Sequence, residues 1–263
     1  MTCELIVAPV EALSEMRNKA RRAVEIDDSL PDGHKYLGLA LFFTFDIVGG
    51  ELELKRAVAL GPNDPWALNF YALLLRCTGR VKEAGKLMVK ARQLDPADST
   101  LMIWECRQLY TERRFEEALK LGQKYAEMNS NSVMTPAVLS EIYIGWQRFE
   151  EAATELKKLR AMDDDPGTTA WLAYVYGQMG RTNEARAALQ ELEILRRNRY
   201  VSAYARAVAH FGLGETNETI RQLELAYEER SPALLTLKII WAWDGLRTDP
   251  RFQALLTKVG LDQ

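Results

Sequence analysis

Residues 65–98 read PWALNFYALLLRCTGRVKEAGKLMVKARQLDPAD, and this stretch decides the fold. Its first half places apolar residues at positions i, i+3, i+4 and i+7, which predicts an amphipathic helix over 65–77. Gly79 ends this helix, because glycine adopts the left-handed conformation without a steric penalty. A second helix follows over 81–94 and stops before Pro96, which lacks an amide donor and disfavours helix in the residue before it. The apolar residues at this spacing, which share one face of the helix, are Leu68, Tyr71, Ala72 and Leu75.

This helical hairpin recurs along the chain with a period of about 34 residues. Pro62 and Pro96 are separated by this step, and small residues follow it at two further positions. Small side chains there allow the two helices of a hairpin to cross closely. The small residues are Gly50, Ala84, Ala118 and Ala152 at one position and Gly38, Ala72 and Cys106 at the other. The period divides the chain into six units, at 31–64, 65–98, 99–132, 133–165, 166–199 and 200–233.

The two ends of the array differ from the repeating units. Residues 10–30 form a half repeat with an amphipathic helix over 10–26, which is the second helix of a hairpin whose first helix is missing. We expect that this chain is cut from a longer one, the alternative being an array that begins on a half repeat. Residues 234–263 are expected to cap the other end, with a short helix that begins at Asp249-Pro250 and ends at Gly260. Trp241 and Trp243 are expected to pack beneath it.

The hairpin and its period resemble the tetratricopeptide repeat. Three motifs are also similar to the C-terminal repeat regions of bacterial multidomain regulators, in which such arrays follow winged-helix DNA-binding, serine/threonine kinase or adenylate-cyclase domains. They are FFTFD at 42–46, LELAYEER at 223–230 and DPRF at 249–252. The resemblance implies one all-α, right-handed α-α superhelix over 1–263, built from antiparallel hairpins and closed by a capping helix. It also implies a sensory or protein-binding role.

In this architecture the first helix of each hairpin lines a concave groove, and the residues between its packing positions point into that groove. Aromatic residues interleaved with arginine are enriched at protein interfaces. We therefore expect an apolar peptide with some acidic character to bind there, although a C-terminal segment or a second copy could fill the groove instead. The expected partner-binding residues are Lys35, Tyr36, Leu39, Phe43, Asn69, Phe70, Leu73, Arg76, Ile103, Trp104, Arg107, Glu141, Trp171, Tyr174 and Tyr204.

Composition narrows the class of partner. A net charge of −3 over 263 residues gives no electrostatic case for direct nucleic-acid binding. No apolar run approaches the length of a membrane span, and residues 1–10 do not have the pattern of a secretory signal. Cys3, Cys77 and Cys106 lack the spacing of a zinc site or a disulfide framework. We therefore expect a reduced cytoplasmic protein that has a protein or peptide partner and could form homo-oligomers.

The sequence contains no catalytic constellation. His34 and His210 are the only histidines, and they fall in units one and six, far apart in a stack. No nucleophile elbow, phosphate-binding glycine loop or dinucleotide fingerprint is present. The aspartates at 163–165 precede a helix, where acidic residues cap the first amides more often than they bind a cation. We expect no enzyme activity, cofactor or metal, which leaves an interaction scaffold, a regulatory array or a self-associating module.

Overall fold

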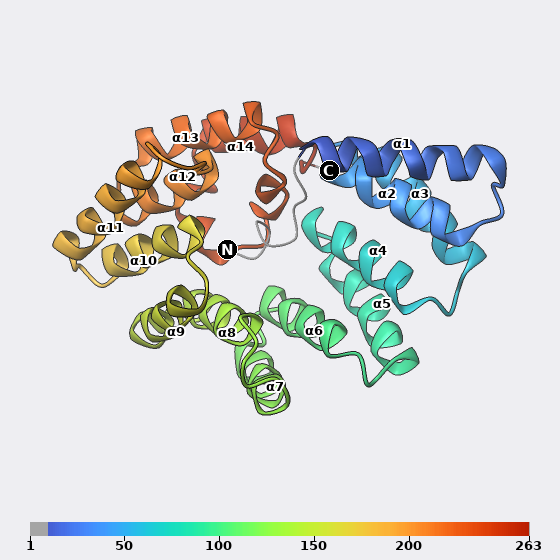
Figure 1. Ribbon diagram of the computed structural model, residues 1–263, viewed down its shortest axis with the longest axis horizontal. Coiled ribbons are helices and arrows are strands. Elements are labelled where there is room, and N and C mark those ends of the chain that lie inside the picture. Colours follow the sequence, from blue (N-terminus) through green and yellow to red (C-terminus); the bar gives the residue numbers. More distant parts are fainter. Residues whose placement is uncertain (1–9, 263) are drawn as a thin grey trace.

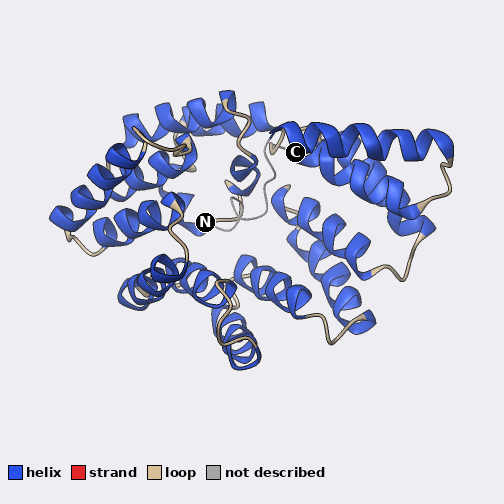
Figure 2. Cartoon of the chain, in the orientation of Figure 1, coloured by secondary structure: helices blue, strands red, loops and turns tan. Residues whose placement is uncertain are grey.

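The computed structural model describes residues 10–262, so the expectations that concern residues 1–9, including Cys3, lie outside the described residues. All regular secondary structure in the described chain is helical (Figure 2). The expected helices over 10–26, 65–77 and 81–94 are confirmed to the residue. The helices are α1 (Val10–Ile26), α2 (Pro31–Phe43), α3 (Ile47–Leu60), α4 (Pro65–Cys77), α5 (Val81–Leu94), α6 (Ser99–Thr111), α7 (Phe115–Met128), α8 (Met134–Gly145), α9 (Phe149–Met162), α10 (Pro166–Gln178), α11 (Thr182–Leu195), α12 (Ala203–Gly212), α13 (Thr216–Glu228) and α14 (Pro250–Val259), with 3-10 helices η1 (Pro232–Thr236) and η2 (Trp241–Leu246).

The small residues of the repeat lie where the helices of a hairpin cross. A Cβ added to Gly38 of α2 would lie 2.8 Å from Leu54 Cγ and 3.0 Å from Gly50 O in α3. Ala72 and Ala84 hold the equivalent crossing of α4 and α5, and both are buried. The two helices can therefore approach closely only because the residues at their crossing are glycine or alanine, as the period predicted.

The turns between the helices of each hairpin share one backbone conformation. Each contains a residue with positive φ, and these residues follow the same period: Phe45, Gly79, Arg113, Gln147, Gly180 and Gly214. A side chain in this left-handed conformation costs about 1–2 kcal/mol relative to the right-handed one, so glycine is the expected residue. Phe45, Arg113 and Gln147 adopt it nevertheless. Phe45 and Arg113 contact the C-terminal part of the chain, as described below.

The hairpins follow one another around a ring, and the C-terminal elements return to the first unit (Figure 1). The Phe45 ring stacks on Tyr227 at the end of α13, with 5.8 Å between the ring centroids. Gly260, just after α14, lies so close to α3 that a Cβ added there would be 3.0 Å from Ile47 Cγ1. The first and last units of the solenoid are therefore in direct contact.

The helix α14 forms as the sequence predicted. The Asp249 carboxylate accepts a hydrogen bond from the Arg251 amide, Pro250 opens the helix, and Gly260 ends it with φ of +83°. Its buried face packs over Trp243, whose ring centroid lies 6.5 Å from that of Phe252. The residues on this face are Phe252, Leu255, Leu256 and Val259.

Two expectations need correction. Trp241 does not pack beneath α14: its indole Nε1 donates a hydrogen bond of 3.0 Å to the carbonyl of Tyr110, in α6. The reason is that the chain between α13 and α14 leaves the end of the stack and crosses the interior of the ring (Figure 1). Asp165 does precede α10, but its side chain makes no capping hydrogen bond.

Candidate peptide-binding groove

The concave groove contains part of the chain itself, residues 232–247, which we call the C-terminal segment. Figure 1 shows η1 and η2 of this segment inside the ring formed by the hairpins. Leu234, Leu235, Leu237 and Ile239 of the segment are all buried. Of the arrangements left open by the sequence, the groove filled by a C-terminal segment is the one that the structure adopts.

Trp104 of α6 forms the centre of the groove wall beneath the segment. The guanidinium carbons of Arg76 and Arg107 lie 5.5 Å and 4.9 Å from its ring centroid, within the range of cation–π attraction. Arg107 Nε also donates a hydrogen bond of 3.2 Å to Glu141 Oε2 in α8. The period accounts for the pairing of Arg107 with Glu141, because residues 34 apart occupy equivalent positions in adjacent first helices.

The segment does not fill the groove completely. A cavity of about 60 Å³ remains between it and the wall, bounded on the segment side by Thr236, Ile239 and Ile240. Two charged groups in the wall of this cavity, Arg107 Nη2 and Glu141 Oε1, are buried and have no hydrogen-bond partner among the described residues. Arg107 as a whole is 7% exposed, so each side chain of the Arg107–Glu141 ion pair keeps one buried polar atom without a hydrogen-bond partner.

The C-terminal segment is anchored to the turns of units two and three. Lys238 Nζ donates hydrogen bonds to the carbonyl oxygens of Thr78, at 3.2 Å, and Leu261, at 2.5 Å, and burial lowers the pKa of Lys238. The Arg113 guanidinium lies 3.8 Å from the ring centroid of Trp241. It also pairs with Asp244 at 3.1 Å. Arg113 is one of the residues with positive φ, so the strained turn directs its side chain onto the segment.

The structure brings together about half of the expected partner-binding residues. Tyr204 Oη accepts a hydrogen bond of 3.2 Å from Trp243 Nε1 of the segment, and Tyr174 packs edge-on against Trp171. Those that line the cavities against the segment are Phe43, Leu73, Arg76, Trp104, Arg107, Glu141 and Trp171.

The other expected residues lie elsewhere. Lys35 forms ion pairs of 2.6 Å with Asp32 and 2.7 Å with Asp64. Phe70 packs against Trp66, and Ile103 belongs to the core between α6, α7 and α8. Leu39 and Asn69 are buried, whereas Tyr36 is exposed on a groove between α1 and α2.

Among the wall residues that sequence reasoning missed are Tyr110, Ile144 and Ser140, and it did not foresee that Thr236, Ile239 and Ile240 would face the wall. The repeat could have identified Tyr110 and Ile144, because they follow Arg76 by one and two periods of 34 residues. The segment residues carry no such periodic signal.

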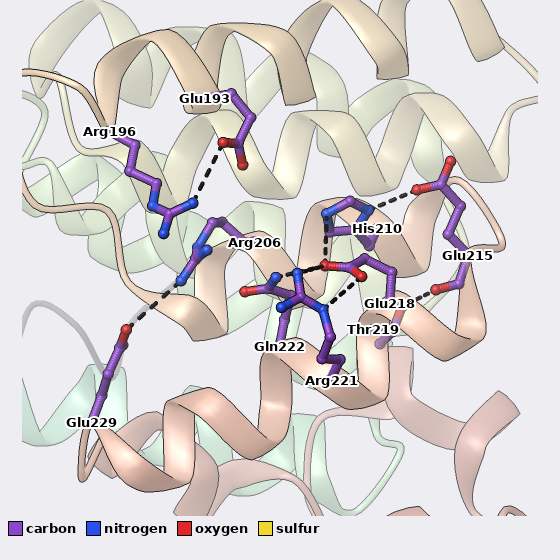
Figure 3. Close-up of polar contacts among 10 residues, drawn as sticks. All are labelled: Glu193, Arg196, Arg206, His210, Glu215, Glu218, Thr219, Arg221, Gln222 and Glu229. Atoms are coloured by element: carbon purple, nitrogen blue, oxygen red, sulfur yellow. Dashed lines mark hydrogen bonds and ion pairs between the residues drawn. The ribbon is translucent and has the colours of Figure 1, made fainter.

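Both histidines are held by neighbouring acidic groups. His34 lies between Glu53 Oε2, at 2.6 Å, and the carbonyl of Asp28, at 2.8 Å. His210 points toward Glu215 and Glu218 in the α12–α13 hairpin (Figure 3), with Nδ1 2.7 Å from Glu215 Oε2. These contacts join a first helix to the second helix of its own hairpin.

Metal-binding and thiol chemistry find little support in the part of the chain that is described. Within it, no group of three or more histidine, cysteine or acidic side chains is arranged to hold a metal ion. Cys77 and Cys106 are buried, and burial raises the pKa of Cys106 to about 12.

Solved structures with the same arrangement of helices are tetratricopeptide-repeat proteins. One such protein from Parabacteroides merdae is 13% identical and superimposes with a TM-score of 0.64, covering 94% of this chain and 92% of that one. The fold is a tetratricopeptide-repeat solenoid. The thermophilic repeat protein TTC0263 of Thermus thermophilus is 20% identical, with a TM-score of 0.60 over 70% of this chain and 99% of that one.

A third solenoid of this kind is human IFIT1, solved as a dimer with PPP-AAAA. It is 14% identical, with a TM-score of 0.65 over 95% of this chain and 66% of that one. No family model matches the sequence, and no curated protein matches it. In the described chain, no helix is both long enough and apolar enough to cross a membrane.

Proposed function

We propose that this solenoid is a non-catalytic interaction scaffold of the cytoplasm whose concave groove binds a peptide segment of a partner protein. The observation that carries the proposal is the unsatisfied pair of Arg107 Nη2 and Glu141 Oε1 in the wall of the groove. The net charge of −3 favours a protein over a nucleic acid as the partner.

The C-terminal segment is an incomplete ligand for its own groove. It presents the apolar side chains of Ile239 and Ile240 to the cavity that contains the charged pair. A buried polar group without a hydrogen bond costs about 1–3 kcal/mol. A partner segment with a hydrogen-bonding side chain at that place would recover part of this cost, and it would therefore compete with the segment.

The charges of the wall indicate which side chain fits best. The cavity is lined by two cations, Arg76 and Arg107, and one anion, Glu141. A carboxylate would accept a hydrogen bond from Arg107 Nη2. The preferred partner is therefore an apolar segment with one acidic residue, a glutamate placed where this chain has Ile240.

Two synthetic peptides test the proposal: residues 231–247, and the same sequence with Ile240→Glu. Their affinity for the full chain is measured by fluorescence anisotropy. We expect the glutamate peptide to bind at least tenfold more tightly than the unchanged one. The preference should vanish in Arg107→Met and persist in Arg114→Met, an arginine outside the groove. Circular dichroism must first show that both variants are folded. Equal affinity of the two peptides for the wild-type chain would contradict the proposal.

A further inference from the structure

We propose that the partner segment carries a tryptophan, and that the solenoid has a socket for its indole ring, which Trp241 occupies in the free chain. This tryptophan would be a second recognised side chain of the segment whose binding was proposed above, so the proposal rests on that function. The socket is formed by Tyr110, in the last turn of α6, and by Arg113, in the α6–α7 turn. We call these two residues the indole socket.

Tyr110 binds both polar groups of Trp241. The indole Nε1 donates a hydrogen bond of 3.0 Å to the Tyr110 carbonyl oxygen, and the Trp241 amide donates one of 3.2 Å to Tyr110 Oη. The carbonyl oxygen also accepts a hydrogen bond from the Arg113 amide, at 3.0 Å, and its second lone pair is open to a donor from outside the helix. The socket therefore offers one acceptor to a single N–H donor at the edge of a ring.

Arg113 adds a preference for a large aromatic ring. Its guanidinium carbon lies 3.8 Å from the centroid of the Trp241 ring, and tryptophan attracts a cation more strongly than tyrosine or phenylalanine does. Tryptophan is also the aromatic residue whose ring carries an N–H donor and no acceptor. A phenylalanine in the socket would lose the hydrogen bond to the Tyr110 carbonyl, and an aliphatic side chain would lose the cation–π contact as well. The socket therefore selects an indole.

The part of the C-terminal segment that carries Trp241 is less buried than the part before it. Residues 232–237 are all buried, whereas Lys238, Ile240 and Trp241 are half-buried. Tyr110 and Arg113 belong to unit three, so the socket remains part of the solenoid when Trp241 is displaced. The exchange of one indole for another is therefore confined to the outer part of the segment.

Ile240 connects the indole socket to the charged pair of the groove. Its side chain lines the cavity that contains Arg107 and Glu141, and Trp241 is the next residue. A partner segment that binds in the same register and places a glutamate beside Arg107 therefore brings its following residue onto the socket. Displacing Trp241 leaves the Tyr110 carbonyl without its indole donor unless that following residue is again a tryptophan. The pair that fits is a glutamate followed by a tryptophan.

Two synthetic peptides test this pairing against the full chain: residues 231–247 with Ile240→Glu, and the same peptide with Trp241→Phe as well. We expect the phenylalanine peptide to bind about tenfold more weakly in fluorescence anisotropy, because it cannot donate to the Tyr110 carbonyl. The difference should shrink in Arg113→Met and persist in Arg114→Met, because Arg114 pairs with Glu112 and Glu117 instead. Equal affinity of the two peptides would overturn this proposal and leave the proposed function intact, whereas binding of neither peptide would overturn both.

Free indole tests the socket without any peptide. In a Trp241→Ala variant that circular dichroism shows to be folded, indole should bind in calorimetric titrations and raise Tm. The ligand 1-methylindole has the same ring but no N–H donor, so it should bind about tenfold more weakly. Trp66→Ala is the matched control and should not distinguish the two ligands, because Trp66 packs on Phe70 and its indole Nε1 makes no hydrogen bond to the described residues. If Trp241→Ala also fails to distinguish indole from 1-methylindole, the indole socket is refuted even where the peptides bind.

Discussion

Replacing Arg113 by glycine separates the strain of its turn from the contact that its side chain makes with the C-terminal segment. Arg113 has φ of +60°, a conformation that glycine adopts freely. The substitution removes this strain but also removes the cation–π contact with Trp241 and the ion pair with Asp244. The sign of the change in stability therefore shows which effect is larger.

The chain contains its own reference for the strain. Gln147 occupies the equivalent turn of the next unit with the same φ of +60°, and its side chain makes no hydrogen bond to the described residues. Relief of a left-handed conformation raises the free energy of unfolding by about 1–2 kcal/mol. The greater freedom of glycine in the unfolded chain lowers it again by about 0.4–1 kcal/mol. We therefore expect Gln147→Gly to raise the free energy of unfolding by about 0.5–1 kcal/mol.

Arg113→Gly should relieve the same strain, with the same increase in the free energy of unfolding, but it also loses the two contacts of the side chain. The cation–π contact is worth about 0.5–2 kcal/mol. The ion pair adds about 0.2–1 kcal/mol, toward the lower end because the Arg113 side chain is largely exposed. The net result is a decrease of about 0.5–1 kcal/mol, so the two glycine variants should differ by roughly 1–2 kcal/mol.

Guanidinium denaturation followed by circular dichroism measures both variants against the wild-type chain. For a chain of this length, 1 kcal/mol corresponds to about 2–4 °C in Tm, so thermal melts provide an independent reading. If Arg113→Gly proves as stabilising as Gln147→Gly, the contact with Trp241 contributes nothing and the reasoning about the anchored segment is refuted.

Three further predictions concern packing, charge and the thiols. A Cβ at Gly177 would lie 1.8 Å from the Gly212 carbonyl oxygen, so Gly177→Ala should lower the free energy of unfolding by about 3 kcal/mol or more, and a Tm within 2 °C of wild type would contradict this. Hydrogen bonding to Arg80 lowers the pKa of Glu51 to about 2. The ionised Glu51 therefore adds on the order of 2 kcal/mol to the free energy of unfolding above about pH 4.5, and this contribution is lost as the pH falls toward 2. Glu51→Gln should flatten this acid limb in denaturation curves taken between pH 2 and 6, and an unchanged limb would count against the ion pair. Because burial raises the pKa of Cys106 to about 12, this thiol in a Cys3→Ser/Cys77→Ser variant should react with a disulfide reagent at pH 8 only after denaturant is added, and prompt reaction of the native variant would refute its burial.

Much of the fold follows from local patterns in the sequence. The helices over 65–77 and 81–94 could be placed to the residue, because proline, glycine and apolar spacing act within a few residues of each other. The capping helix was predictable for the same reason, since Asp249, Pro250 and Gly260 specify its ends.

The candidate site was only partly predictable. The period identified Trp104, Arg107 and Glu141 as groove residues, because equivalent positions in first helices point in equivalent directions. It could not show that the cavity beside them would be closed by Thr236, Ile239 and Ile240. These residues lie beyond the last unit, where no repeat constrains their position.

By itself, the sequence determined the period, the helices over 65–77 and 81–94, the small residues at the helix crossings and the ends of α14. Only the tertiary structure decided that the ring closes, that residues 232–247 occupy the groove, and that Trp241 packs on Tyr110. The contact between Trp241 and Tyr110 joins residues 131 positions apart. It depends on the rotation between successive hairpins summed over several units, so that small angles fixed by inter-unit packing determine where the chain end arrives. No local pattern encodes that sum.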